Sequence, residues 1–358
     1  MISNPSTLID KYIQQGSFSG AALVVARHNQ IVYEYYAGDA APGLPASANV
    51  LWPLASISKV YSAAAIMKLM EMGELPLSTL VSQVLPKFTG EGRELVRLRH
   101  LLTHTAGMIY ESPEMEARLI AQTPLSDLIE EMYRAPLNFS PGTSIAYADY
   151  HYLLAGHVAA TVTGTPFHEL VQNLVIKPMG LEQTWFPPPA ALHSQIAKVH
   201  AVMAEGTEGA MYNSAYALGL AHPAFGVVAS AADVVRFALH FAPGGPRIHS
   251  EATVRAMTTV QTGLVRGQPA IPALGSPGNI IPWGLGFCLQ TEHSPGIFSE
   301  LASLRSFGHG GASGCQLMVD PEANVVVALV SNTHARSGRE TWYPRLQSIV
   351  NCALANVD

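Results

Sequence analysis

The sequence predicts an α/β protein in which strands from the two ends of the chain form one antiparallel sheet, covered by helices, with a helical insertion between them. Residues 21–26 and 31–36 have high β propensity and flank a polar turn, which is typical of a hairpin. Residues 316–319 and 325–331 flank a second polar turn near the C-terminus. Helical patterns dominate residues 75–205, between these two hairpins.

The composition indicates a chain that buries a large core without the help of disulfides or metals. Of its 358 residues, 48% are hydrophobic and 13% are charged, whereas a typical soluble domain carries about 25% charged residues. A chain of this length buries roughly three quarters of its unfolded surface. Its three cysteines have neither a zinc-binding spacing nor a disulfide pattern: Cys288, Cys315 and Cys352. The Gly- and Pro-rich stretch 263–282 is expected to be a surface loop.

Charge and hydropathy exclude two classes of partner. The net charge is −6 and no run of Lys or Arg occurs, which argues against nucleic acid as a main partner. The longest apolar runs, 21–26 and 325–330, are far shorter than the ~20 residues of a membrane-spanning helix. The N-terminus shows no signal-peptide pattern, so we expect a cytoplasmic protein that acts on a small molecule. A periplasmic or secreted form whose leader had been removed would have the same sequence.

A serine and a lysine at the predicted start of a helix are the first candidates for catalytic residues. Ser56 and Lys59 are three positions apart, so in a helix they share a face. A serine hydroxyl is a weak nucleophile until a base takes its proton, and a desolvated lysine can be neutral enough to do so. The positive end of the helix would favour negative charge on the serine oxygen. The alternative is a capping serine and a solvated lysine, because this spacing also arises by chance.

The segment Tyr147-Ala148-Asp149 supplies a second candidate. A phenol beside a lysine cation can have a lowered pKa and then act as a base. The alternative is a buried tyrosine that opens a helix over residues 150–163, with Asp149 as the N-cap.

The glycine-rich segment 307–314 supplies a third candidate. Its small residues would let a substrate backbone approach a strand closely. The backbone N–H of Ala312, after Gly311, would then be available to bind an oxyanion. The alternative is an ordinary glycine-rich turn before the second hairpin.

In this order, the three segments resemble the motifs of the serine β-lactamase-like and penicillin-binding-protein-like family. Residues 56–59 resemble its S-x-x-K motif, residues 147–149 its Y-x-N motif and residues 309–311 its K/H-x-G motif. The form with tyrosine is similar to class C β-lactamases, DD-peptidases, family VIII carboxylesterases and 6-aminohexanoate-dimer hydrolases. The resemblance extends over residues 15–352 and includes three further stretches: 101–107, 227–237 and 283–286.

The resemblance implies a β-lactamase/transpeptidase-like fold and a division of the chain into two domains. Residues 1–75 and 205–358 would form the α/β domain. Residues 76–204 would form an all-α domain. The active site would lie in the cleft between them.

The resemblance also implies a role for each candidate residue. Ser56 would be the nucleophile that accepts the acyl group, with Lys59 as its proton acceptor. Tyr147 would relay the proton to the leaving group and later activate the water that deacylates the enzyme. The backbone N–H groups of Ser56 and Ala312 would form the oxyanion hole. Four further residues would contact the substrate: Asp149, His309, Gly310 and Gly311. Neither a cofactor nor a metal is implied.

Two departures from the family pattern bear on the substrate. Asp149 replaces the usual Asn, and a carboxylate cannot donate the amide N–H that would bind a substrate carbonyl. If Asp149 faces Lys59, it also stabilises the charged amine and makes it a poorer base. His309 replaces the Lys of β-lactamases and so removes a fixed positive charge. We therefore expect a preference for neutral esters or amides and weak or absent β-lactam turnover, while a cationic amine on the substrate could face Asp149.

Other signals favour ordinary structural roles. His104, in a Thr-His-Thr sequence, is expected to be structural, as this motif is in the family that the chain resembles. His151 and His157 would lie on different faces of a helix and make a poor metal pair. Cys315 breaks the G-x-S-x-G pattern that begins at Gly311, which argues against an α/β-hydrolase.

The sequence therefore favours a cofactor-independent serine hydrolase, an esterase or amidase that works through an acyl-enzyme. Transfer of the acyl group to an acceptor other than water is also conceivable. The alternative enzymes are a D-amino-acid peptidase and a true β-lactamase, although a cytoplasmic location would argue against both. An alternative from another class is an acyl-binding or sensor protein without turnover. The sequence does not predict an oligomeric state.

Overall fold

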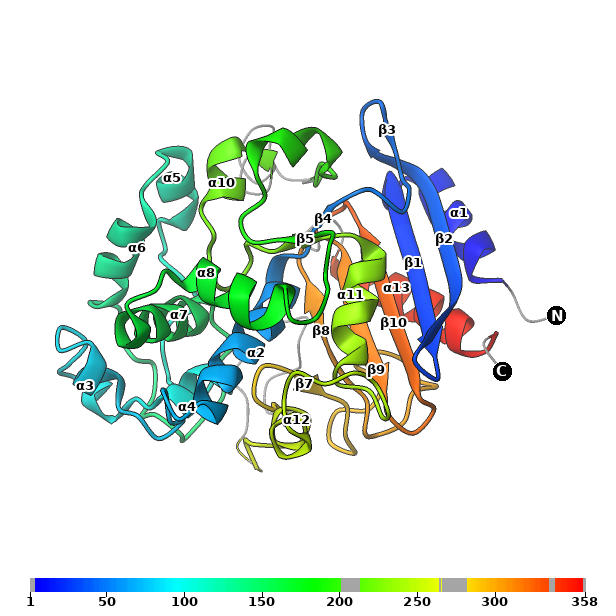
Figure 1. Cartoon of the computed structure of the whole chain (residues 1–358). Helices are drawn as coiled ribbons and strands as arrows, with labels where there is room; N and C mark the ends of the chain where they lie inside the picture. Colours follow the sequence, from blue (N-terminus) through cyan, green and yellow to red (C-terminus); the bar gives the residue numbers. More distant parts are fainter. Residues whose placement is uncertain (1–3, 201–212, 264, 266–281, 335–338, 357–358) are drawn as a thin grey trace.

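A seven-stranded antiparallel sheet built from both ends of the chain organises the fold, as the sequence predicted (Figure 1). The computed structural model describes residues 4–200, 213–263, 265, 282–334 and 339–356. In sheet order the strands are β3 (Leu44–Pro45), β2 (Gln30–Ala41), β1 (Gly20–Arg27), β10 (Val325–Ser331), β9 (Cys315–Asp320), β8 (Phe307–Gly311) and β7 (Cys288–Leu289).

The N-terminal hairpin turns more tightly than the sequence indicated. β1 and β2 pair up to Arg27 and Gln30, so only His28 and Asn29 form the turn. Both of these residues have positive φ, 49° and 65°, which matches the right-handed twist of the flanking strands. β1 then pairs with β10 from Ala21 to Arg27, which joins the two ends of the chain at the centre of the sheet.

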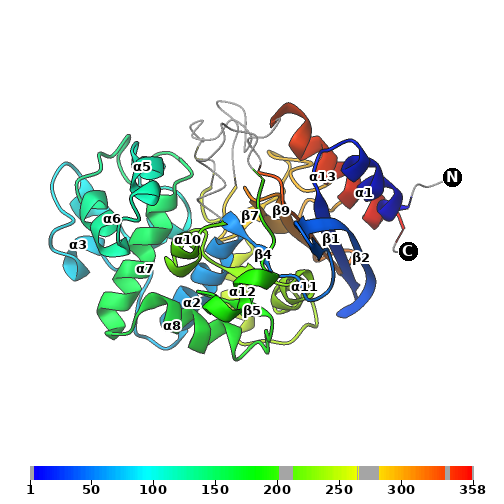
Figure 2. The ribbon, with the colours of Figure 1, turned by 90° about the horizontal axis from the view of Figure 1, so that it is seen from above.

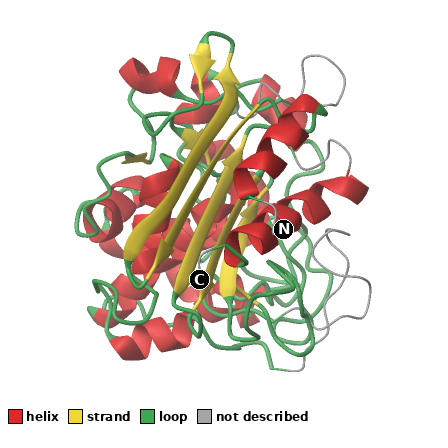
Figure 3. Ribbon diagram, turned by 90° about the vertical axis from the view of Figure 1, so that its right-hand side faces the viewer, coloured by secondary structure: helices red, strands yellow, loops and turns green. Residues whose placement is uncertain are grey.

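The central strands are buried on both faces, and each face has its own core. On one face α1 (Pro5–Gln14) packs against α13 (Arg339–Leu354), and Figure 3 shows these helices in front of the sheet. On the other face α11 (Ala231–Leu239) packs on β1, β9 and β10. Side chains of β1 alternate between the two cores, as the two-residue period of a strand requires.

Helix α2 (Ser58–Glu71) links the sheet to the helical part of the chain (Figures 1 and 2). Most of its side chains are buried, which is the pattern of a helix surrounded by protein. It packs against α7 and α8. The other elements here are α3 (Val81–Val84), η2 (Arg93–Leu95), α4 (Leu98–Leu102), α5 (Met115–Ile120), α6 (Leu125–Met132), α7 (Asp149–Thr163), α8 (Phe167–Val171), a π-helical turn (Gln172–Ile176) and η4 (Ala190–Gln195).

A small second sheet holds the chain just before α2. Its strands are β4 (Trp52–Pro53), β6 (Val228–Ala229) and β5 (Thr184–Trp185), in that order. Asp233 on α11 accepts hydrogen bonds from the Gln183 N–H at 2.7 Å and the Thr184 hydroxyl at 3.1 Å, and so ties β5 to α11. Two short helices complete the described chain: α10 (Ala215–Gly219) and α12 (Glu251–Met257).

Three expectations concern the chemistry of the chain as a whole. All three cysteines are buried and none is in a disulfide. Within the described ranges, no helix has the length and apolar character needed to cross a bilayer. The loop expected at 263–282 lies almost entirely outside the described residues.

Candidate active site

Ser56 lies in a strained turn that leads into α2. The turn is the 3₁₀ segment η1 (Ala55–Ile57), and Ala55 has a φ of 45°, a conformation that costs a non-glycine residue about 1–3 kcal/mol. The residue at the N-cap of α2 is Ile57, so the interpretation of Ser56 as a simple helix cap is wrong. The surrounding structure holds the serine at a backbone position that the turn would not adopt freely.

Lys59, one turn further, is fully buried and has three oxygen atoms around its amine. Its Nζ donates to Ser56 Oγ at 3.1 Å and to the Ala224 carbonyl at 3.2 Å. It lies 2.6 Å from Asp149 Oδ1, and the two side chains are 0% and 4% exposed. The alternative of a solvated lysine is therefore wrong.

Asp149 is the first residue of α7, and its carboxylate faces Lys59. The N-cap of this helix is Ala148, so the interpretation of Asp149 as the N-cap is wrong. The backbone N–H groups of Asp149 and Tyr150 both donate to the Tyr110 carbonyl, at 2.8 and 3.2 Å. These bonds fix the start of α7 and direct the carboxylate at the lysine amine.

The burial of Lys59 and the charge of Asp149 act in opposite directions on the lysine. Burial lowers the pKa of Lys59 below its ordinary value of 10.5, whereas Asp149 and, more weakly, Glu111 raise it. Burial has the larger effect. The amine is thus a stronger candidate for a base than a surface lysine, although Asp149 makes it a poorer base than burial alone would give.

Tyr147 lies against the lysine but does not have the lowered pKa that the sequence suggested. Its ring centroid is 4.7 Å from Lys59 Nζ. Burial and the charge of Asp149 raise the pKa of Tyr147 well above 10, and a hydrogen bond with Ser56 opposes them. The expectation fails because Asp149 compensates the lysine charge and because burial disfavours the phenolate. Tyr147 is therefore a neutral phenol at rest.

His104 positions the segment that carries Tyr147. The Ala146 N–H donates to the His104 carbonyl at 2.9 Å, and the Ala148 N–H donates to His104 Nδ1 at 3.3 Å. Nδ1 is therefore an acceptor, so the nearby Nδ1 of His151, 3.0 Å away, is its second donor. In the part of the chain that the structure describes, no cluster of His, Cys, Asp and Glu could hold a metal.

Strand β8 brings the glycine-rich segment to the serine turn. A Cβ on Gly311 would lie 2.4 Å from the Leu54 carbonyl, so only glycine allows this approach. Ala312 packs with Ala55 and Val199 in a small apolar cluster. The predicted oxyanion-hole residues, Ser56 and Ala312, thus belong to segments in direct contact.

His309 forms the wall of the site on the side of the sheet. Its ring centroid is 6.0 Å from that of Tyr147 and 5.6 Å from that of Trp283. Its Nδ1 donates to the Gly310 carbonyl at 2.6 Å. Burial and the Lys59 charge lower the pKa of His309 to about 3, so the ring is neutral at pH 7.

Two contributors to the site were not predicted from the sequence as functional residues. Trp283 stacks near Tyr147 and His309, and its stretch 283–286 only added to the family resemblance. The Ala224 carbonyl beside Lys59 left no signal, because a backbone oxygen far along the chain has no sequence pattern.

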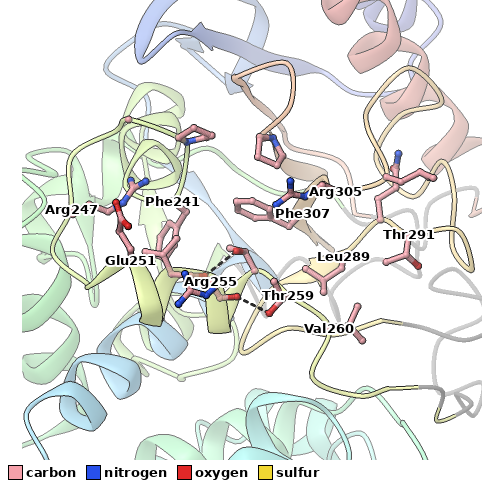
Figure 4. Close-up of a pocket in the computed structure, with 17 residues that line it drawn as sticks. Phe241, Arg247, Glu251, Arg255, Thr259, Val260, Leu289, Thr291, Arg305 and Phe307 are labelled. Atoms are coloured by element: carbon pink, nitrogen blue, oxygen red, sulfur yellow. Dashed lines mark hydrogen bonds between the residues drawn. The ribbon is translucent and has the colours of Figure 1, made fainter.

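A larger hollow lies away from this cluster (Figure 4). It has a volume of about 690 Å³, and none of the predicted site residues lines it. Arg247, Arg255 and Arg305 lie around an apolar floor that includes Phe241 and Phe307.

The chain belongs to the β-lactamase family. The family model named Beta-lactamase matches residues 6–349. Among curated proteins, the chain is 29% identical to penicillin-binding protein 4 of Amycolatopsis lactamdurans, over 81% of this chain and 74% of that protein. It is 28% identical to esterase EstB of Burkholderia gladioli, over 91% and 89%.

Solved structures share the fold over almost the whole chain. EstCE1, described as a hydrolase with promiscuous acyltransferase activity, has a TM-score of 0.77 at 24% identity and covers 97% of both chains. The D-amino acid amidase of Ochrobactrum anthropi SV3 has a TM-score of 0.77 at 19% identity, covering 99% of this chain and 100% of that one. The β-lactamase/transpeptidase-like fold expected from the sequence is confirmed.

Loss of one partner of the buried ion pair should cost more than loss of both. Lys59→Met leaves the Asp149 carboxylate buried without a cation, and we expect the free energy of unfolding to fall by about 3–5 kcal/mol. Lys59→Met with Asp149→Leu should recover most of that loss in urea unfolding. Lys87→Met, which breaks the exposed pair with Glu130, is the control and should cost less than about 1 kcal/mol. Equal losses in the single and double variants would contradict the prediction.

Proposed function

We propose that this protein is a serine hydrolase that cleaves small neutral esters or amides through an acyl-enzyme on Ser56. The observation that carries the proposal is the contact of Ser56 Oγ with the amine of the fully buried Lys59. Burial of a lysine costs several kcal/mol, and a scaffold has no need to spend it beside a strained serine. The names of two relatives, an esterase and an amidase, agree with this class of reaction.

Acylation follows from the positions of three side chains. Ser56 Oγ attacks the substrate carbonyl carbon, and its proton passes to the neutral amine of Lys59. The backbone N–H groups of Ser56 and Ala312 would hold the oxyanion of the tetrahedral intermediate. When the bond to the leaving group breaks, Tyr147 donates its phenolic proton to that group and regains one from Lys59.

Deacylation reverses these proton transfers with water in place of the leaving group. Tyr147 takes a proton from the attacking water, and Lys59 takes the phenolic proton in turn. The new oxyanion collapses, the bond between Ser56 Oγ and the acyl carbon breaks, and the serine regains its proton from Lys59. The enzyme returns to its starting state.

The charges around the site favour neutral substrates. Asp149 compensates the charge of Lys59 at 2.6 Å, and His309 is neutral. A substrate carboxylate therefore finds no uncompensated cation among the described side chains of this cluster. This is why we place ester or amide hydrolysis ahead of β-lactamase or D-amino-acid peptidase activity.

The proposal keeps the division of the chain expected from the sequence. Residues 1–75 and 205–358 would form the α/β domain, and 76–204 the helical domain. Ser56, Lys59 and His309 would then come from the first, and Tyr147 and Asp149 from the second. The reaction would take place where the two domains meet.

Ser56→Ala tests the nucleophile. We expect the variant to lose turnover of p-nitrophenyl butyrate by about 10³-fold or more, while wild-type protein quenched during turnover carries a butyryl group on Ser56 in mass spectrometry. Ser62→Ala, a serine on the same helix that donates to the Pro223 carbonyl, is the control and should keep its activity. Equal slow rates in wild type and Ser56→Ala would refute the proposal. An adduct that forms and persists would favour the sensor alternative.

The substrate class is tested by direct comparison of a β-lactam with an ester. Because the described site offers no uncompensated cation to a carboxylate, kcat/KM for p-nitrophenyl butyrate should exceed kcat/KM for benzylpenicillin. The measurement is initial-rate kinetics at pH 7 with one enzyme preparation. A larger kcat/KM for benzylpenicillin would reverse the assignment and favour the β-lactamase alternative.

Asp149→Asn should move the acidic limb of the pH profile of kcat/KM to lower pH. Asp149 raises the pKa of Lys59, so without its charge the amine loses its proton at a lower pH. Below the limb, kcat/KM should rise roughly tenfold for each pH unit of the shift. Asp127→Asn, an exposed residue on α6, removes the same charge elsewhere and should leave the limb in place. An unchanged or raised limb in Asp149→Asn would show that Lys59 is not the titrating base.

A further inference from the structure

A second cavity begins at the wall of the proposed active site. It has a volume of about 240 Å³ and lies between the end of the sheet and α13. His309 and Gly310 of strand β8 line it, so it borders the same wall that faces Tyr147. Trp283, Ile297, Phe298, Cys315 and Tyr343 are among its other described lining residues.

The described lining of this cavity carries no charge. It contains no Asp, Glu, Lys or Arg, and burial keeps His309 neutral. The Gln316 side-chain amide donates to the Phe298 carbonyl at 2.8 Å, and that of Gln347 to the Gly296 carbonyl, so both amides are already engaged. A charged group would lose its hydration here without gaining a partner of opposite charge, which is strongly unfavourable.

The size of the cavity fits one substituted ring. A dry cavity of about 150 Å³ is large enough to bind benzene. A cavity of about 240 Å³ therefore accommodates a ring with a short substituent, between aromatic and aliphatic side chains that favour apolar contact.

The position of the cavity relates it to one half of the substrate. In the proposed mechanism Tyr147 protonates the leaving group, and the His309 ring, 6.0 Å from the Tyr147 ring, separates the phenol from the cavity. We propose that this cavity binds the leaving group and selects esters and amides of neutral, ring-sized alcohols and amines. The inference rests on the proposed function, because it assigns a substrate class to the same site.

Three butyrate esters test this selectivity, with each kcat/KM divided by the hydroxide-catalysed rate of the same ester to remove intrinsic reactivity. Benzyl butyrate should exceed ethyl butyrate by roughly tenfold or more, because the ring is buried. 4-Carboxybenzyl butyrate should fall at least about 100-fold below benzyl butyrate, because its carboxylate meets an uncharged wall. Equal values for the three esters would overturn the proposal.

A filled cavity should remove the preference for the ring. In Ile297→Trp, the benzyl-to-ethyl ratio of kcat/KM should fall by roughly tenfold. Val260→Trp is the control, because Val260 lines the other hollow (Figure 4) and is 43% exposed. Its ratio should match that of the wild type. If both variants kept the wild-type ratio, the cavity would not bind the leaving group.

A measurement on the wild-type protein does not depend on whether Ile297→Trp folds. Benzyl methyl ether, which has no hydroxyl to acylate, should inhibit hydrolysis of ethyl butyrate competitively, and 4-(methoxymethyl)benzoate should not. Equal inhibition by both, or by neither, would contradict the proposal. If Ser56→Ala kept ester turnover, the proposed function itself would fail. If turnover required Ser56 but the benzyl-to-ethyl ratio ignored Ile297→Trp, only the cavity assignment would fail.

Discussion

The buried ion pair between Lys59 and Asp149 is the interaction on which the geometry of the site depends. Removal of each charge from water costs several kcal/mol, and the cost is offset only if the partner stays in place. Lys59 is at the start of α2 and Asp149 at the start of α7, so the pair joins the helix next to the sheet to the helical part of the chain. Any movement of one helix start against the other would expose or unpair both charges.

The same contacts place a serine where an unconstrained turn would not hold it. Ala55 has a φ of 45°, and three contacts around it make that strain affordable. β4 pairs with β6 just before the turn, Gly311 packs against the Leu54 carbonyl, and the Lys59 amine donates to Ser56 Oγ. Strain of this kind persists only where the surrounding structure fixes the backbone on several sides.

Electrostatic balance distinguishes this site from one built to bind an anion. The lysine charge is compensated by Asp149, His309 is neutral because it is buried, and the described lining of the neighbouring cavity contains no charged residue. These three features have one consequence, a low capacity to stabilise a charged substrate group in place of water. Neutral acyl donors and neutral leaving groups are the chemistry that such surroundings favour.

The sequence by itself determined what depends on neighbours along the chain. Both hairpins were predicted from β-rich runs around polar turns, and Ser56 and Lys59 were placed on one face because three residues are nearly one helical turn. The tertiary structure decided what depends on burial and distant contacts. The Ala224 carbonyl reaches Lys59 across 165 positions, and the pKa of Tyr147 rises because packing excludes water and brings Asp149 close. Desolvation and charge pairing arise only when remote segments meet, so no local pattern records them.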